Sequence, residues 1–199
     1  MSELEELADV IRQCDQCLLS QERTQAVPGE GDDRSGVMFI GVGPGFHEDR
    51  QGRPFVGAAG QFLDELLASI GMDRSQVYIT NMVKCRPPGN RDPFPSEVEA
   101  CSKYLDAQIS ILNPKVIVTL GRHSLSKFFT NEKIMQARGK PRPWKNTVVL
   151  PVLHPAAALY RSQLKDVMIK DFQAIPSLLS DEESSSHSDD QTPHQLSML

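Results

Sequence analysis

Residues 37–49, VMFIGVGPGFHED, predict a buried strand that runs directly into a turn rich in glycine and proline. Three more short apolar runs follow along the chain, and segments with helical spacing of apolar residues separate them. The four predicted strands cover residues 37–41, 77–80, 116–121 and 147–153. Strands that alternate with helices predict an α/β fold in three layers, α/β/α, with a central, mainly parallel sheet of four strands.

Helices are predicted where apolar residues recur three and four positions apart. These segments cover residues 3–13, 61–70, 96–112, 124–129 and 163–179. Gly71 stands where the second helix should end, and Ser96 with Glu99 has the pattern of a capping box. Pro151 in the last strand indicates an edge or a bend, because proline cannot donate a hydrogen bond to a neighbouring strand.

The composition is that of a globular protein of one domain, with 199 residues, of which 39% are hydrophobic and 24% charged. The sequence has no apolar run of the roughly 18–20 residues that a membrane span needs, and its acidic, amphipathic start is unlike a secretory signal. We therefore expect one domain over residues 1–180, in a cytoplasmic monomer that makes no contact with a membrane. Residues 181–199 hold five acids and no lysine or arginine, and they predict a disordered, acidic tail.

A basic segment lies within this chain, whose net charge is −5. Residues 121–147 carry seven lysines and arginines against the single acid Glu132. An excess of this size is suited to contact with phosphates, although a solvated surface segment would have the same composition. The candidates for phosphate contact are Arg138, Lys140 and Arg142.

The chain has four cysteines: Cys14, Cys17, Cys85 and Cys101. In a reducing compartment such a set favours a metal site over disulfides, and the CxxC spacing of the first pair suits two thiolates on one metal centre. Zinc and a [4Fe–4S] cluster both accept four thiolates, so the spacing leaves the choice between them open. Buried thiols without a metal are the other alternative.

Three motifs are more specific: GVGPGFHEDRQGRPFVGAAGQFLDELL (41–67), TNMVKCRPPGNRDPFPSEVEAC (80–101) and LHPAAAL (153–159). They resemble the successive motifs of family 4 uracil-DNA glycosylases, and the resemblance covers about residues 4–178. It implies a compact α/β/α glycosylase fold and a [4Fe–4S] cluster on the four cysteines. It also implies hydrolysis of the N-glycosidic bond of flipped-out uracil in DNA, which initiates base excision repair.

Residues at the predicted strand ends fit the recognition of uracil, because ligands of parallel sheets bind beyond the carboxyl ends of the strands. A base within duplex DNA must be flipped into a pocket before it can be read. Phe55 can stack on the base, Asn81 can pair with uracil O4 and N3, and His154 can donate to O2 as negative charge develops. Gly41 and Gly43 allow the backbone to approach the nucleotide closely. A place for Phe55 in the core, and a turn-forming role for Asn81, are the structural alternatives.

Val42 departs from the family resemblance, because family 4 enzymes usually carry an acid at this position of the substrate site. A valine cannot polarise water or stabilise a cationic sugar, so Glu48 is the candidate for orienting the water. We expect excision to persist, since uracil departs as a fairly stable anion. Two alternatives stay open: a damage-binding homologue whose catalysis is weakened by Val42, and a zinc-stabilised nucleotide-binding module.

A wedge for the DNA is predicted just after the third motif. Leu159, with Tyr160 or Arg161 beside it, could fill the gap that the flipped base leaves in the duplex.

The last five residues, QLSML (195–199), predict a contact with a partner protein. They resemble the short peptide by which many DNA-processing proteins bind the bacterial sliding clamp. The alternative is a chance match within a solvated end.

Overall fold

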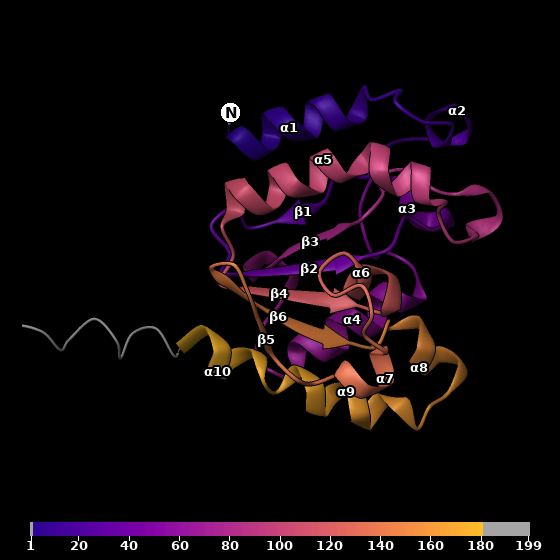
Figure 1. Ribbon diagram of the computed structural model, residues 1–199. Coiled ribbons are helices and arrows are strands. Elements are labelled where there is room, and N and C mark those ends of the chain that lie inside the picture. Colours follow the sequence, from indigo (N-terminus) through magenta and orange to yellow (C-terminus); the bar gives the residue numbers. More distant parts are fainter. Residues whose placement is uncertain (1, 181–199) are drawn as a thin grey trace, which may run out of the picture.

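Among residues 2–180, which the computed structural model describes, six strands form one mixed sheet in the order β1-β3-β2-β4-β6-β5 (Figure 1). The parallel centre consists of β2 with β3 and β4 on either side, and β6 pairs with β4. The two outermost strands, β1 and β5, run antiparallel to their neighbours. The strands are β1 (Glu30–Gly31), β2 (Val37–Gly41), β3 (Tyr78–Asn81), β4 (Val116–Leu120), β5 (Arg142–Trp144) and β6 (Thr147–Val152).

The predicted α/β fold with four parallel strands is confirmed, and the sheet has two edge strands that the sequence did not predict. Every residue of β2, β3 and β4 is buried, which fits the mostly apolar sequences of these strands. The edge strands β1 and β5 have only two and three residues, too few for an alternating pattern to be recognised.

Pro151 is accommodated because β6 extends past the end of its neighbour β5. The pairing of β5 with β6 stops at Val149. On that side of the strand the carbonyl of Pro151 accepts a hydrogen bond of 2.8 Å from the backbone N–H of Gly139. The proline therefore costs the sheet no interstrand hydrogen bond on that side.

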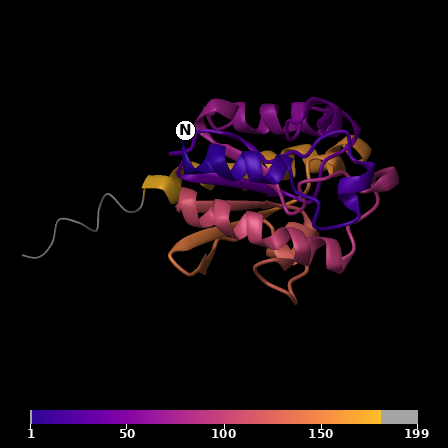
Figure 2. The ribbon, with the colours of Figure 1, turned by 90° about the horizontal axis from the view of Figure 1, so that it is seen from above.

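Helices cover both faces of the sheet (Figure 1). On one face α1 (Glu3–Arg12) lies alongside α5 (Pro95–Leu112), as Figure 2 also shows. On the other face α4 (Ala58–Ala68) packs against α9 (Leu164–Phe172), and α10 (Ile175–Ser180) follows. Alternate residues of β2 serve the two faces: Phe39 packs with the α4 and α9 core, and Ile40 packs with the α5 core. No helix within residues 2–180 is long and apolar enough to cross a membrane.

The predicted capping box of Ser96 and Glu99 is wrong. The helix α5 begins one residue earlier, at Pro95, where proline loses nothing because the first N–H of a helix has no partner within it. The carboxylate of Glu97 then accepts the N–H of Phe94 at 2.7 Å and a two-pronged ion pair from Arg91 at 2.8 and 2.7 Å.

The predicted helix over residues 163–179 is two helices, α9 and α10, with Gln173 and Ala174 between them. Pro176 stands in the first turn of α10, where it cannot continue the hydrogen-bond pattern of the preceding helix. The other helices are short: α2 (Leu19–Glu22), α3 (Phe46–Gln51), α6 (Arg122–Ser126), α7 (Ile134–Ala137), α8 (Ala156–Tyr160) and the 3-10 helices Arg74–Gln76 and Pro88–Asn90.

The parallel strands point their carboxyl ends toward the same edge of the sheet, to the right in Figure 1. The short helices α3, α6 and α8 follow β2, β4 and β6 at this edge. The segments that follow β2, β4 and β6 therefore lie at the same edge of the sheet. The predicted tail at 181–199 and its clamp-like peptide lie outside the described residues.

Candidate active site

A cavity of about 570 Å³ opens at the carboxyl ends of the parallel strands. Its walls come from the loops that follow β2, β3, β4 and β6. Six residues that the sequence selected for the substrate site or for catalysis line it: Val42, Gly43, Glu48, Phe55, Asn81 and His154. Segments far apart in the chain therefore meet in one site, as predicted from the strand ends.

Asn81 ends β3 at the bottom of this cavity, with 1% of its surface exposed. Its Oδ1 atom is buried and has no hydrogen-bond partner among the described residues. A buried acceptor without a partner costs about 1–3 kcal/mol. A ligand that donates a hydrogen bond into the cavity would recover that energy.

His154 follows β6 and presents a hydrogen-bond donor to the cavity. The backbone N–H of Ala156 donates to its Nδ1 at 3.2 Å, so the proton of the neutral ring resides on Nε2. Burial lowers the pKa of His154 to about 4, and the charge of Glu48 only partly opposes this shift. The ring is therefore a neutral donor at neutral pH.

The ring of Phe55 stacks on the ring of His154, with centroids 5.7 Å apart and an interplanar angle of 30°. Gly41 makes this arrangement possible. A Cβ atom at Gly41 would lie 2.3 Å from Asn81 Oδ1 and 2.7 Å from Phe55 Cζ. The predicted need for glycine is thus real, but its cause is the packing of Asn81 and Phe55 over the backbone.

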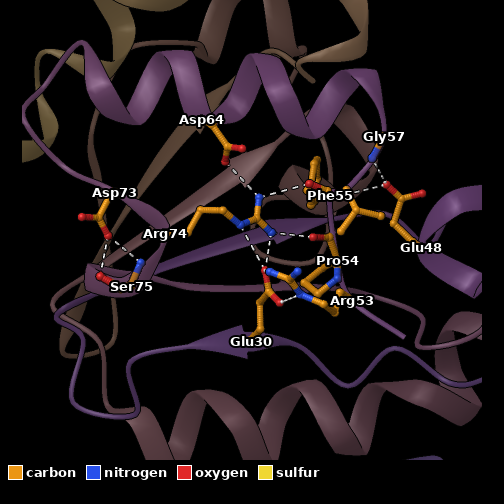
Figure 3. A network of polar contacts seen from close by, with 11 residues as sticks. Glu30, Glu48, Arg53, Pro54, Phe55, Gly57, Asp64, Asp73, Arg74 and Ser75 are labelled. Atoms are coloured by element: carbon orange, nitrogen blue, oxygen red, sulfur yellow. Dashed lines mark hydrogen bonds and ion pairs between the residues drawn. The ribbon is translucent and has the colours of Figure 1, made fainter. Parts of the chain in front are cut away.

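The backbone of Phe55 has a φ of +52°, a left-handed conformation that is unfavourable for an aromatic residue. Arg74 holds it in place (Figure 3). Its guanidinium donates to the carbonyls of Pro54 and Phe55 at 2.6 and 3.1 Å. The same group forms ion pairs with Glu30 at 2.5 Å and with Asp64 at 3.0 Å. These contacts offset the strain of the loop that carries the stacking ring.

The carboxylate of Glu48 connects the two ends of the same loop by hydrogen bonds (Figure 3). Oε1 accepts the backbone N–H groups of Val56 and Gly57, both at 2.9 Å, and Oε2 accepts that of Gly45 at 3.1 Å. Most of its acceptor capacity is therefore used by the protein. One lone pair of Oε2 is left for a further donor, such as a water in the cavity.

The predicted DNA contacts lie away from the cavity walls. Arg138 pairs with the buried Asp171 at 2.6 Å, and Arg142 pairs with Glu132. Lys140 is exposed and has no ion pair among the described residues. Four of the seven bases of segment 121–147 form ion pairs: Arg122 with Asp92, Lys127 with Asp106, Arg138 with Asp171 and Arg142 with Glu132.

The α8 helix presents its predicted wedge residues near the mouth of the cavity. Leu159 is 48% exposed and Tyr160 is 89% exposed, but only Tyr160 lines the cavity, and Arg161 is an exposed residue just beyond the helix. Two arginines, Arg91 and Arg122, also line it. Arg122 belongs to the basic segment 121–147 and directly follows β4, as the sequence indicated, whereas no sequence argument selected Arg91.

The four cysteines line a second, small cavity together with Arg23, Lys84 and Tyr104. Arg23 Nη1 donates to Cys85 Sγ at 3.0 Å, and the backbone N–H of Lys84 donates to Cys101 Sγ at 3.3 Å. Burial raises the pKa of Cys85, and it raises the pKa of Cys101 to about 11. Within residues 2–180 no three cysteine, histidine or acidic side chains converge on the position of a single metal ion.

Lys84 lines the cavity of the cysteines and also contacts Asn81, which lines the larger cavity. Its side chain is buried, and its Nζ donates to Thr80 Oγ1 at 2.7 Å, to the carbonyl of Asn81 at 2.7 Å and to Gln108 Oε1 at 2.6 Å. Burial lowers the pKa of Lys84 to about 7. The backbone of Asn81 is therefore held by a residue that also borders the cavity of the cysteines.

Comparisons with known proteins agree on one family. The family model of the uracil DNA glycosylase superfamily matches residues 28–174. The chain is 48% identical over 188 residues to the type-4 uracil-DNA glycosylase of Sulfurisphaera tokodaii, which covers 89% of this chain and 86% of the relative. It is 43% identical over 187 residues to that of Archaeoglobus fulgidus, covering 88% and 94%. It is 42% identical over 184 residues to that of Thermotoga maritima, covering 90% and 96%.

Protonation of His154 should destabilise the folded protein. Its pKa is about 4 when folded, against about 6.5 in an unfolded chain. The unfolded chain therefore binds the proton more tightly, and the stability contributed by neutral His154 is complete above pH ~6.5 and lost as the pH falls toward the folded pKa. The free energy of unfolding, measured with urea, should fall between pH 7 and pH 4.5. The fall should be about 2 kcal/mol larger for the natural protein than for His154→Gln. Equal losses in the two proteins would contradict this assignment.

Proposed function

Since this chain belongs to the type-4 uracil-DNA glycosylases, DNA repair enzymes that hydrolyse the N-glycosidic bond of uracil in DNA, we propose that the cavity at the strand ends holds the flipped-out uracil. The observation that carries this proposal is the buried Oδ1 of Asn81, which lacks a partner among the described residues. Uracil offers N3–H as a donor and O4 as an acceptor on one edge, and a carboxamide complements both. Phe55 supplies the flat surface on which the base stacks.

His154 is proposed to stabilise the leaving group. When the bond between C1′ of the sugar and N1 of uracil breaks, its electron pair moves into the ring and negative charge develops on O2. The Nε2–H of a neutral His154 donates a hydrogen bond to that oxygen, and its orientation is fixed beforehand by the Ala156 N–H on Nδ1. Preorganised donors of this kind act without reorganisation during the reaction.

Water completes the hydrolysis. Its oxygen forms the new bond to C1′ and gives up one proton, the departing uracil anion takes up a proton, and the products are free uracil and an abasic sugar. We propose that the remaining lone pair of Glu48 Oε2 orients this water, because Val42 offers no acceptor from its side chain. Glu48 thereby combines a structural and a catalytic role.

A damage-binding protein with weakened catalysis is the second candidate, favoured by the apolar Val42 in the cavity wall. Single-turnover excision of uracil from an oligonucleotide separates the two. An enzyme releases uracil at a measurable rate, whereas a damage-binding protein retains the uracil-containing strand intact.

Substitution of Asn81 or His154 should lower the rate of that excision. Asn81→Ala removes the partner of the uracil edge and His154→Ala removes the donor to O2, so each should slow excision by ~10²-fold or more. Val42→Glu should raise the rate or leave it unchanged. If His154→Ala excises uracil at the natural rate, the proposed role of His154 is wrong.

We propose that Cys14, Cys17, Cys85 and Cys101 hold a [4Fe–4S] cluster. All four line one cavity, and the N–H donors of Arg23 and Lys84 suit thiolate sulfurs. A single zinc ion needs its sulfurs converged at about 2.3 Å from one point, and the described cysteines do not converge in that way. When bound, the cluster would cross-link the segment after α1 to the end of β3 and to α5.

Loss of any one cysteine should therefore affect both colour and stability. Cys101→Ala, compared with the natural protein after purification without oxygen, should lose its visible iron–sulfur absorption and unfold at a lower temperature, because metal binding is coupled to folding. Ser102→Ala, one residue along the same helix, is the matched control. A colourless natural protein with stoichiometric zinc would overturn the proposal.

A contact with the sliding clamp is proposed for the carboxyl-terminal peptide 195–199, outside the described residues. Gln195 would offer its amide to the rim of a clamp pocket, while Leu196, Met198 and Leu199 fill an apolar groove. The tether would keep the enzyme beside DNA and raise its local concentration there.

Deletion of residues 195–199 should abolish binding to the bacterial clamp and leave excision on short oligonucleotides unchanged. Deletion of residues 185–189, which keeps the peptide, is the control. Surface plasmon resonance on an immobilised clamp measures the interaction. Absence of binding by the full chain at high micromolar concentration would show that the peptide has no such role.

A further inference from the structure

We propose that exposed aromatic and arginine side chains around the mouth of the uracil cavity form a stacking platform for unpaired bases, so that the enzyme binds single-stranded DNA more tightly than duplex DNA. The inference rests on the proposed position of uracil in that cavity. The platform consists of Phe46, Phe94 and Tyr160 with Arg50, Arg86 and Arg91.

The distribution of exposed aromatic rings is the first argument. Among the phenylalanine, tyrosine and tryptophan residues of 2–180, only Phe46, Phe94 and Tyr160 are exposed, at 45%, 55% and 89%. All three belong to segments that form the cavity wall. Tyr160 lines the cavity itself, and the other two directly follow residues that line it, Gly45 and Pro93. Exposed aromatic rings that gather in this way mark a binding surface.

The charge around Phe46 is the second argument. The guanidinium carbons of Arg50 and Arg86 lie 5.5 and 5.1 Å from the centroid of its ring. Neither arginine forms an ion pair with a carboxylate among the described residues, although nine other lysines and arginines do. Two like charges beside one ring are favourable when an anion lies between them, as a backbone phosphate would.

Arg86 links Phe46 and Arg50 to the wall of the cavity. Its Nε donates to Asn90 Oδ1 at 2.7 Å, and Asn90 lines the cavity. A phosphate held by Arg86 would therefore belong to a nucleotide next to the flipped uracil.

The Phe94 side of the mouth differs in its chemistry. The Arg91 guanidinium lies only 3.8 Å from the centroid of the Phe94 ring, and its charge is already balanced by the buried Glu97 at 2.7 Å. This side therefore offers a flat stacking surface without a net charge, suited to a base. In a duplex the flanking bases stack on each other and are paired, so they can meet these rings only when the strand is single.

Binding should be measured on an oligonucleotide with a stable abasic analogue in place of the uracil nucleotide, in single-stranded and duplex form, by fluorescence anisotropy with the intact protein. Phe46→Ala, Phe94→Ala and Tyr160→Ala should each weaken single-strand binding by about 5- to 100-fold, the scale of one lost base stack. Duplex binding by Phe46→Ala and Phe94→Ala should change by less than about 2-fold. Phe46→Trp should retain the affinity. Val10→Ala, at a position 56% exposed on α1, is the control for loss of an exposed apolar group.

Unchanged single-strand affinity in all three alanine variants, or equal losses on both forms of DNA, would overturn the proposal. The salt dependence gives a second readout. Arg50→Gln with Arg86→Gln should flatten the slope of log affinity against log salt by about 0.7 for each phosphate that the protein no longer neutralises. A flatter slope for Lys140→Gln alone would place the strand along residues 138–142 instead.

Asn81→Ala distinguishes a failure of the stacking platform from a failure of the proposed uracil site. Asn81→Ala should lose excision and keep the preference for single strands. If the natural protein binds single strands selectively and Asn81→Ala excises normally, the uracil site is wrong and the platform stands.

Discussion

Three backbone N–H groups that donate to the Glu48 carboxylate are the constraint on which the active site depends. They bring the two ends of a long loop together, so that Gly45 lies beside Val56 and Gly57. Phe55 precedes this junction and takes up a left-handed backbone conformation, which Arg74 stabilises from the opposite side. A charged hydrogen bond of this kind is worth about 1.5–3 kcal/mol, which matches the typical cost of such strain. The stacking ring is therefore rigid before any substrate arrives.

The geometry of recognition follows from the parallel sheet. Asn81 ends β3 and His154 follows β6, so the stagger of these strands sets the distance between the amide and the imidazole across the cavity. Burial keeps the imidazole neutral at neutral pH, so the proposed hydrogen bond to the leaving group would come from an uncharged ring. Gly41 leaves room for Asn81 and Phe55 to approach the same point of the backbone.

The sequence predicted what depends on local pattern and missed what depends on distant partners. The central strands were predictable because they are apolar on both faces, and Asn81, Phe55 and His154 because they follow such strands or occur in recognisable motifs. The start of α5 was misplaced because Pro95 and Glu97 compete with an equally good local signal at Ser96. The pairing of Arg138 with Asp171, 33 residues away, could not be derived from the charge of the segment. The exposure of the Phe46 ring was likewise not predicted, because Phe46 lies within a motif whose other residues line the active site.

Lys84 has a consequence for how this protein can change over evolutionary time. Its ammonium group is satisfied only if Thr80, Gln108 and the carbonyl of Asn81 are all in place, and Gln108 in turn donates to Tyr78 and to the carbonyl of Pro28. An apolar replacement at position 108 would leave a buried ammonium short of an acceptor, and an apolar replacement at position 84 would remove the donor to the carbonyl of Asn81. Substitutions at these two positions are therefore coupled. The backbone N–H of the same lysine donates to Cys101 Sγ, so a substitution at position 84 would affect both the cysteine cavity and the residues beneath Asn81.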